Sequence, residues 1–242
     1  MAVHDSPITF SPINKHFSIF PERIPLIDQN SCASIWDLLV DGSRHWKLRD
    51  SGFGFYTYGT PSYMDAVESL TYYIYESAQV NCFLRPIFNI LCPELVRLLS
   101  RQCGVSEQYI LPLPFASFPG FHIFAPTFSP DHNMKSSFHH DLQHELILPL
   151  IHNVLRFEAS NQIELLSFTL PIKLPGSGAG LCFCEESVGV HRLAYAVGEI
   201  VLHGGQNSHK IDDGYRCNAG DVRATLQGHA IKTVSGKLFY YW

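Results

Sequence analysis

Charged side chains are scarce in this sequence, and those of one sign are not clustered. Asp, Glu, Lys and Arg make up 16% of the 242 residues, against roughly 25% in an average globular domain. The net charge is −5, and no long run of Lys or Arg is present. Because binding to a phosphate backbone requires clustered basic side chains, a nucleic acid is not an expected partner.

Targeting and cross-linking features are also missing. No apolar stretch approaches the roughly 20 residues of a membrane-spanning helix, so no association with a membrane is expected. The first residues, Met1 to Asp5, lack the basic and apolar regions of a secretory signal. The seven cysteines are scattered without a framework of pairs, which favours reduced thiols and a cytoplasmic location. Nothing in the sequence indicates an oligomeric state.

No internal repeat, low-complexity stretch or long linker divides the chain. Hydrophobic residues make up 46% of the sequence, which is ample material for a core, and a chain of this length is within the range of one domain. We therefore expect a single domain over residues 1–242. Within it, residues 1–108 should form N-terminal loops and covering helices, and residues 109–242 a β-rich core.

The N-terminal part changes character near residue 60. Residues 1–60 are rich in Pro, Ser, Gly and aromatic residues and are interpreted as loops and short strands. Apolar residues at helical spacing predict one helix over about residues 61–79, with Thr60 as its N-cap. They predict a second helix over about residues 84–102, which ends just before Gly104.

From about Tyr109 onward the pattern is that of strands. Short runs rich in β-branched and aromatic residues alternate with turns that contain Gly, Asn and Asp. The predicted strands cover residues 121–124, 162–170, 180–184, 194–203, 222–232 and 237–241. Helices followed by many short strands predict an α+β fold with a β-sandwich or barrel.

Four polar features follow one another in the β-rich part. His139 and Asp141 form a His-x-Asp pair, and residues i and i+2 on or just past a strand lie on the same side. His209 comes 68 residues after Asp141. Arg223 comes 14 residues after His209, and Thr225 shares the strand face of that arginine.

These residue types suit one kind of metal chemistry. Two histidines and one carboxylate on one face of an octahedral ion leave three positions open, as in non-heme iron(II) oxygenases. A keto acid can occupy two of these positions and O2 the third. The planar guanidinium of Arg223 matches a distal carboxylate of such a keto acid, and the Thr225 hydroxyl can add a hydrogen bond.

In the order and spacing of these five residues, the chain resembles the iron(II)/2-oxoglutarate-dependent oxygenase superfamily. The superfamily pattern is His-x-Asp, a distant His and then Arg-x-Ser/Thr, which His139-x-Asp141, His209 and Arg223-x-Thr225 match. The resemblance covers roughly residues 110–242. It implies a double-stranded β-helix, or jelly-roll, similar to a cupin barrel, with the N-terminal helices packed on the outside. It also implies Fe(II) held by the first three residues, with 2-oxoglutarate and O2 as co-substrates.

The resemblance further implies an enzyme that oxidises an unactivated C–H bond while 2-oxoglutarate becomes succinate and CO2. The outcome can be hydroxylation, desaturation or oxidative ring closure. Two alternatives stay open. A cupin-type metalloenzyme would not use 2-oxoglutarate, although its His-x-His…Glu…His pattern is missing here. A non-enzymatic ligand-binding jelly-roll would hold no metal.

Other histidines compete for roles near the motif. His203, at the end of an apolar run, is the main alternative to His209. His140 should point away from the metal if its stretch is extended, whereas a helical stretch would place it beside His144. The polar residues of the run that contains His229 form either the wall of a ligand cavity or a face turned to water; they are Arg223, Thr225, Gln227 and His229.

A small molecule, an amino acid or a metabolite derived from one, is the expected substrate, because no added domain is available to hold a macromolecule. Aromatic residues are expected to line its pocket, and the candidates are Phe53, Phe55, Tyr56, Phe121 and Phe138. A few isolated cations could bind its carboxylate, namely Arg49, Arg85, Lys135 and Arg192.

Overall fold

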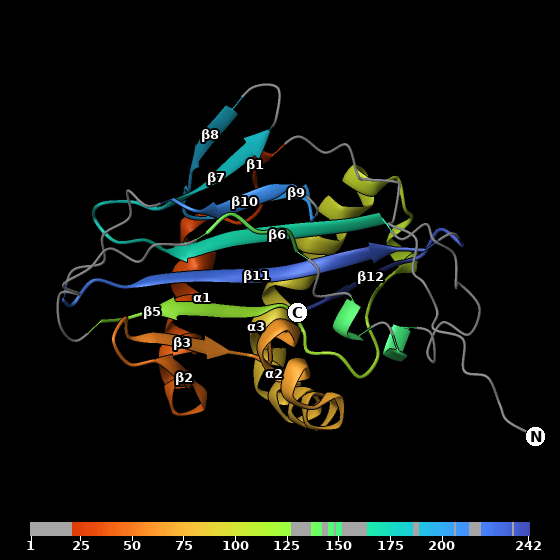
Figure 1. The fold of residues 1–242 in the computed structure, drawn as a ribbon, viewed down its shortest axis with the longest axis horizontal. Coiled ribbons are helices and arrows are strands. Elements are labelled where there is room, and N and C mark those ends of the chain that lie inside the picture. The colour runs from red at the N-terminus through yellow and green to blue at the C-terminus, as the bar shows by residue number, and fades with distance from the viewer. Residues whose placement is uncertain are drawn as a thin grey trace, which may run out of the picture.

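The computed structural model describes residues 21–126, 137–141, 145–147, 149–151, 164–185, 189–205, 207–212, 219–233 and 235–242. Within this part of the chain, two β-sheets and a set of helices form the fold (Figure 1). The elements in chain order are β1 (Glu22–Pro25), α1 (Gln29–Asp41), η1 (Ser43–His45), β2 (Lys47–Asp50), β3 (Phe55–Tyr58), α2 (Ser62–Glu68), α3 (Leu70–Cys103), η2 (Glu107–Tyr109), β4 (Ile110–Pro112), β5 (Gly120–Phe124), β6 (Glu164–Lys173), β7 (Gly180–Glu185), β8 (Gly189–Ala194), β9 (Glu199–Gly204), β10 (Ser208–Ile211), β11 (Arg223–Lys232) and β12 (Leu238–Tyr241).

The larger sheet has the order β1-β9-β6-β11-β5-β3-β2. Its long central strand, β11, pairs with β6 on one side, and on the other side with β5 and then β12. The smaller sheet has the order β10-β7-β8, and an isolated bridge between His139 and His209 adds the segment 137–141 to its edge. Chain segments thus alternate between two mostly antiparallel sheets, which is the arrangement of a jelly-roll.

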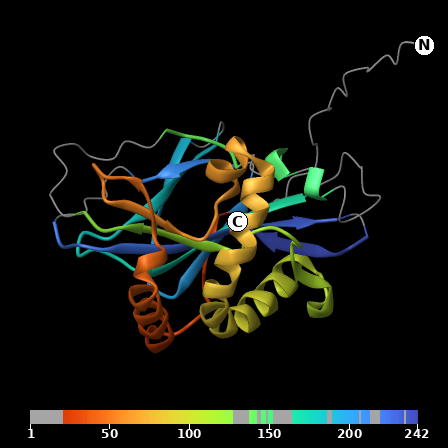
Figure 2. The same ribbon diagram turned by 90° about the horizontal axis from the view of Figure 1, so that it is seen from below.

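The two faces of β11 have opposite surroundings. Its residues Ala224, Leu226 and Ala230 belong to one core cluster with buried residues of α1 and α3, and Figure 2 shows these helices along one side of the larger sheet. Arg223 and Thr225 alternate with them and are wholly buried. The alternative that this polar face is turned to water is therefore wrong.

The helical stretch after residue 60 is divided differently from the prediction. Pro61, rather than Thr60, occupies the N-cap position of α2, and α2 ends at Glu68. Ser69 is extended, at φ −164° and ψ 120°, and its side chain accepts a hydrogen bond from the Tyr72 amide to begin α3. The helix then continues through Pro86 and Pro93. Each proline removes one helical hydrogen bond, but a buried apolar stripe along α3 holds the helix against the sheet.

The end of α3 agrees with the sequence, whereas α1 was not expected. α3 ends at Cys103 and is capped by Gly104, whose φ of 62° is the left-handed conformation that glycine adopts easily. α1 lies in a stretch that was interpreted as loops and short strands. Asp28 caps it by accepting a hydrogen bond from the Ser31 amide. No helix in the described part of the chain is long and apolar enough to cross a membrane.

Most strands of the β-rich part lie where they were predicted, and the differences are local. β9 begins at Glu199 rather than near residue 194, because Val197 and Gly198 form a turn in which Gly198 has φ 82°. β4, β8 and β10 were not among the predicted strands. The N-terminal stretch, where short strands were expected, supplies β1, β2 and β3. In the larger sheet β1 pairs with β9, β3 pairs with β5, and β2 pairs with β3.

Candidate metal centre

Two backbone hydrogen bonds place His139 directly opposite His209. The His139 amide donates to the His209 carbonyl at 2.9 Å, and the His209 amide donates to the His139 carbonyl at 3.0 Å. Residues opposed in this way on antiparallel segments present their side chains on the same side. The Asp141 amide donates to the Gly205 carbonyl at 2.8 Å. Because residues 139 and 141 are two apart in extended backbone, the carboxylate joins the two imidazoles.

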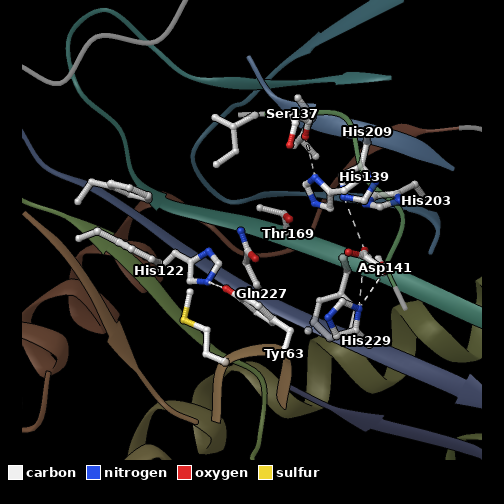
Figure 3. Close-up of a pocket in the computed structure, with 18 residues that line it drawn as sticks. Tyr63, His122, Ser137, His139, Asp141, Thr169, His203, His209, Gln227 and His229 are labelled. Atoms are coloured by element: carbon white, nitrogen blue, oxygen red, sulfur yellow. Dashed lines mark hydrogen bonds and ion pairs between the residues drawn. The ribbon is translucent and has the colours of Figure 1, made fainter. Parts of the chain in front are cut away.

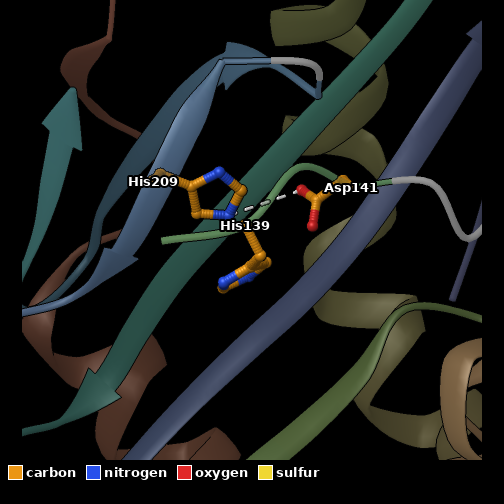
Figure 4. A group of neighbouring side chains, drawn as sticks. All are labelled: His139, Asp141 and His209. Atoms are coloured by element: carbon orange, nitrogen blue, oxygen red, sulfur yellow. Dashed lines mark ion pairs between the residues drawn. The ribbon is translucent and has the colours of Figure 1, made fainter. Parts of the chain in front are cut away.

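The three side chains form one compact group, drawn in Figure 4. Their candidate ligand atoms all lie within 4.8 Å of one another, with Asp141 and His209 buried and His139 exposed. Asp141 Oδ2 is 3.7 Å from His209 Nε2. With small side-chain adjustments, atoms at this spacing can reach one divalent ion at roughly 2.0–2.2 Å.

Backbone carbonyl groups determine which nitrogen of each imidazole carries hydrogen. His209 Nδ1 lies 2.8 Å from the Asn207 oxygen, and His139 Nδ1 lies 3.0 Å from the Ser137 oxygen. A carbonyl oxygen can only accept, so each Nδ1 donates and each neutral ring presents an unprotonated Nε2. Burial lowers the pKa of His209 and so favours this neutral form. Hydrogen bonding of this kind is usual behind metal-binding histidines.

Asp141 is held by a hydrogen-bonded chain that continues into β11. Ser167, on β6, donates to Asp141 Oδ2, and the Ser167 oxygen lies 3.0 Å from His229 Nδ1. Since the one hydroxyl hydrogen is used on the carboxylate, His229 Nδ1–H must donate to Ser167. Burial alone would raise the pKa of Asp141, but the neighbouring imidazoles and the Ser167 hydrogen bond lower it below its ordinary value. The carboxylate is therefore ionised at neutral pH.

A cavity of about 370 Å³ adjoins this group (Figure 3). It is lined by the segment 137–141 and by residues of β3, α2, β5, β6, β7, β9, β10 and β11. Of the expected aromatic residues, Phe55 lines it, whereas Phe53, Tyr56, Phe121 and Phe138 do not. On β5 the reason is alternation: Phe121 packs into the core beneath the helices, and His122 and Phe124 face the cavity.

The described cations expected to serve the substrate are placed elsewhere. Arg49 and Lys47 form ion pairs with the buried carboxylate of Asp65. Arg192 pairs with Asp212 at 3.1 Å, and Arg85 is exposed on α3. Lys135 lies outside the described residues. None of the three described arginines lines the cavity, so the expectation that they face the substrate is wrong for this cavity.

Arg223 and Thr225 lie deeper than the three-residue group. Both side chains are wholly buried, and neither is among the described residues that line the cavity. The guanidinium carbon of Arg223 lies 5.3 Å from the ring centre of Phe124 and 5.5 Å from that of Tyr195. Phe124 is itself part of the cavity wall. Arg223 therefore packs directly behind a residue of the cavity wall.

The competing histidines are accounted for in different ways. His203 is buried, and its ring centre is 4.5 Å from that of His209, but it is not part of the three-residue group. Its Nδ1 lies 3.0 Å from the Gly204 oxygen, and it lines the cavity. Residues 137–141 are not helical, and His140 is exposed outside the group. His144 lies outside the described residues.

Several side chains near the group were missed by reasoning from the sequence. Ser167 alternates with buried apolar residues along β6, as does Thr169, and this period of two could have marked an inward polar face. Tyr63 and His122 also line the cavity. They are 59 residues apart in the sequence, and no local pattern connects them.

Comparison with known proteins gives a likeness only at the level of structure. No protein-family model matches the chain, and no curated protein matches it. A crystal structure of an N-substituted L-amino acid dioxygenase from Burkholderia ambifaria, in complex with α-ketoglutarate, matches with a TM-score of 0.51 and 15% identity, over 90% of this chain and 84% of that one. The α-ketoglutarate-dependent epimerase SnoN of nogalamycin biosynthesis matches with a TM-score of 0.48 and 11% identity, over 88% and 80%. The chain therefore has the jelly-roll fold of an α-ketoglutarate-binding dioxygenase, which confirms the resemblance drawn from the sequence at the level of the fold.

Proposed function

We propose that the chain is a single-domain iron(II)- and 2-oxoglutarate-dependent oxygenase that oxidises an unactivated C–H bond of a small molecule. The observation that supports this most is the meeting of the His139 and His209 imidazoles, each with its Nδ1 on a backbone carbonyl group, with the carboxylate of Asp141 beside a cavity. Two neutral imidazoles and one carboxylate form a donor set suited to non-heme iron(II). A shared fold alone would not identify a function.

Three residues next to the group, Ser137, Asn207 and Ser167, have a defined task in this proposal. When bound, iron(II) supplies open coordination positions at which O2 and the keto acid react. The carbonyl groups of Ser137 and Asn207 keep both imidazoles in the tautomer that presents Nε2. Ser167 fixes the orientation of the Asp141 carboxylate by donating to one of its oxygens. The apolar side chains of Phe168, Leu181 and Ile211 in the cavity wall limit the access of water to the reacting atoms.

Arg223 is proposed to bind the distal carboxylate of 2-oxoglutarate, with Thr225 adding a hydrogen bond. The rings of Phe124 and Tyr195 flank the guanidinium group and keep water away from it. A charge-assisted, two-pronged pair is strong in such a setting. The guanidinium group packs against Phe124, which lines the cavity, so this role requires that ring to move or the co-substrate to extend alongside it.

For the substrate, we propose an amino acid or a small metabolite derived from one. The cavity volume of about 370 Å³ is of the size that holds small organic molecules. The B. ambifaria enzyme with the same fold is described as acting on N-substituted L-amino acids, which makes free and N-substituted amino acids the first compounds to assay.

The test is to load metal-free protein with iron(II) without oxygen and then to measure bound iron and 2-oxoglutarate-dependent succinate. A panel of free amino acids, N-substituted amino acids, short peptides and neutral terpenoids supplies candidate substrates. We expect one tightly bound iron per chain and succinate formation that requires 2-oxoglutarate. Asp141→Ala should lose both, whereas the exposed control Asp37→Ala on α1 should lose neither.

The same measurements separate the alternatives. Iron binding with oxygen consumption that does not depend on 2-oxoglutarate would indicate a cupin-type metalloenzyme. Absence of tight metal binding, with His139→Ala behaving as the wild type, would indicate a ligand-binding jelly-roll. Either result would overturn the proposal.

A further inference from the structure

A tyrosine–histidine pair lies in the cavity wall, away from the His139–Asp141–His209 group (Figure 3). Tyr63 is the second residue of α2, and His122 is the central residue of β5. The Tyr63 hydroxyl is hydrogen-bonded to His122 Nε2. Both side chains line the same cavity as the candidate metal ligands. A molecule that fills this cavity therefore contacts both the candidate metal ligands and this pair.

Both members of the pair are uncharged at neutral pH. Burial raises the pKa of Tyr63 well above its ordinary value, so the phenol keeps its hydrogen. Burial lowers the pKa of His122 to about 3, and the nearby charges of Arg223 and Arg49 add to this effect. The pair therefore holds two hydrogens, one on the phenol and one on the imidazole, and uses one of them internally.

The one hydrogen that the pair does not use internally determines which ligand groups the pair can bind. If His122 Nε2–H donates to the phenol oxygen, the phenol hydrogen is available to an acceptor in the cavity. If the phenol donates to Nε2, its oxygen can still accept from a hydroxyl or an amide N–H. A neutral group that contains oxygen, such as a hydroxyl, a ketone or an amide, therefore meets a donor, an acceptor or both.

Surrounding contacts hold the His122 ring in place. It packs edge-on against Phe55, with ring centres 5.1 Å apart, and tilted against Trp242 at 5.3 Å. Its backbone is fixed in β5 between β3 and β11. A binding group held in this way loses little conformational freedom when a ligand arrives.

Tyr63 is anchored through its own helix. Asp65, two residues further on in α2, is buried and accepts hydrogen bonds from Arg49 and Lys47 of β2. Burial alone would raise the pKa of Asp65, but these two cations lower it, so the ion pairs persist at neutral pH. Arg49 also donates to Thr57 on β3, directly opposite His122. One set of contacts thus fixes α2 relative to the strand that carries His122.

Part of the wall next to the pair is an apolar patch. Phe55 and Phe124 stack with ring centres 4.6 Å apart and an interplanar angle of 11°, and both line the cavity. Met64 lines it as well. Gln227 lies close to the pair and Thr169 also lines the cavity, so the pair borders an apolar patch within a mixed wall. A few polar groups beside an apolar surface are the arrangement that orients a small ligand.

We infer that Tyr63 and His122 form the substrate-recognition site: they bind a neutral hydroxyl, carbonyl or amide group and place the substrate's apolar body against Phe55 and Phe124. This deepens the proposed function, because it names the class of substrate group bound in the same cavity. The orientation that results would present one particular carbon to the metal centre, so the pair would decide which C–H bond reacts.

The experiment uses fragments that differ in one polar group. Benzamide, benzyl alcohol, toluene and benzoate are titrated into the full chain with Zn(II) and 2-oxoglutarate present, and binding is followed by saturation-transfer NMR. A typical net hydrogen bond corresponds to a few-fold to about tenfold in affinity. We expect benzamide and benzyl alcohol to bind more tightly than toluene by about this factor, and more tightly than benzoate.

Variants then assign the preference to the pair. Tyr63→Phe keeps the ring and removes the hydroxyl, so the preference over toluene should fall to near one. Tyr75→Phe, at an exposed position of α3, is the matched control and should keep the preference. A preference for benzoate, no preference in the wild-type chain, or an unchanged preference in Tyr63→Phe would each overturn the inference.

Failure of this inference can be told apart from failure of the proposed function. Tyr63→Phe should bind iron(II) as tightly as the wild type, because the hydroxyl is not a metal ligand in the proposal, and Asp141→Ala should not. If the wild-type chain binds no iron but still prefers benzamide over toluene, the oxygenase proposal falls and the binding pair stands.

Discussion

Ser167 donates its one hydroxyl hydrogen to the carboxylate of Asp141, which links strand β6 to the candidate metal group. Ser167→Ala should leave that carboxylate oxygen without this donor and allow the side chain to rotate. Loss of such an outer contact typically weakens metal binding by about 10- to 100-fold. Iron(II) titration without oxygen should show this change, whereas Ser34→Ala, on the exposed side of α1, should not. Equal affinities would mean that the serine does not orient the ligand.

Arg223 supplies the prediction for the co-substrate. Arg223→Met should raise the 2-oxoglutarate concentration needed for half-maximal succinate formation by about 100-fold or more, because charge-assisted hydrogen bonds contribute roughly 1.5–3 kcal/mol each. Bound iron should stay near the wild-type level. Arg192→Met, which removes an exposed arginine of β8, is the control. If the requirement for 2-oxoglutarate does not change, another group binds its distal carboxylate.

His122 should make the protein less stable in acid. Its pKa is about 3 in the folded chain and roughly 6.5 when unfolded, so between these values the unfolded state binds the extra proton. Its contribution to stability is complete above about pH 6.5 and decreases as the pH falls, by roughly 1.4 kcal/mol per unit.

Urea unfolding at pH 7.5 and pH 5.5 measures this contribution. The loss of unfolding free energy between the two pH values should be smaller in His122→Gln than in the wild type, by about 1 kcal/mol. His191→Gln, at an exposed position of β8, should behave as the wild type. Identical losses in all three proteins would contradict the assignment of His122 as a buried neutral group.

The fourth prediction concerns packing at the start of β5. A Cβ atom at Gly120 would lie 2.1 Å from the ring of Trp242 and 2.7 Å from the Tyr58 carbonyl oxygen. Gly120→Ala should therefore destabilise the fold by about 1–3 kcal/mol, as overpacking of a core does. Gly176→Ala meets no atom within 4 Å and should have little effect. The midpoints of urea unfolding compare the two, and equal midpoints would show that the indole ring can shift freely.

The sequence predicted those features that rest on local pattern. Alternation along β11 separated Ala224 and Leu226, which face the helices, from Arg223 and Thr225, which are buried on the other face. The spacing of His139 and Asp141 predicted that both side chains share one side, and the structure brings them together with His209. In each case the pattern within one short stretch of sequence was enough to predict which way the side chains face.

Other features escaped prediction for physical reasons. α1 has a local signal, in the Asp28 cap and the buried spacing of Cys32, Ile35 and Leu39, but Pro and Ser around it hid the pattern. β10 is only four residues long and lies between turn residues, so its pairing partner defines it rather than its composition. The contact of Tyr63 with His122 depends on how α2 sits against β5, which no local pattern records.

Few backbone hydrogen bonds are described between the segment 137–141 and the smaller sheet, so a bound metal ion would affect the stability of this edge. The segment 137–141 meets β10 through one bridge, and Asp141 meets Gly205 through one further backbone hydrogen bond. An ion shared by His139, Asp141 and His209 would act as a cross-link between parts of the chain that are far apart in sequence. An ion that binds only the folded state stabilises that state in proportion to the logarithm of the ion concentration. The concentration of free metal would therefore set the fraction of molecules in which the segment 137–141 is paired with β10. Removal of the metal would then make the segment 137–141 more accessible to proteases.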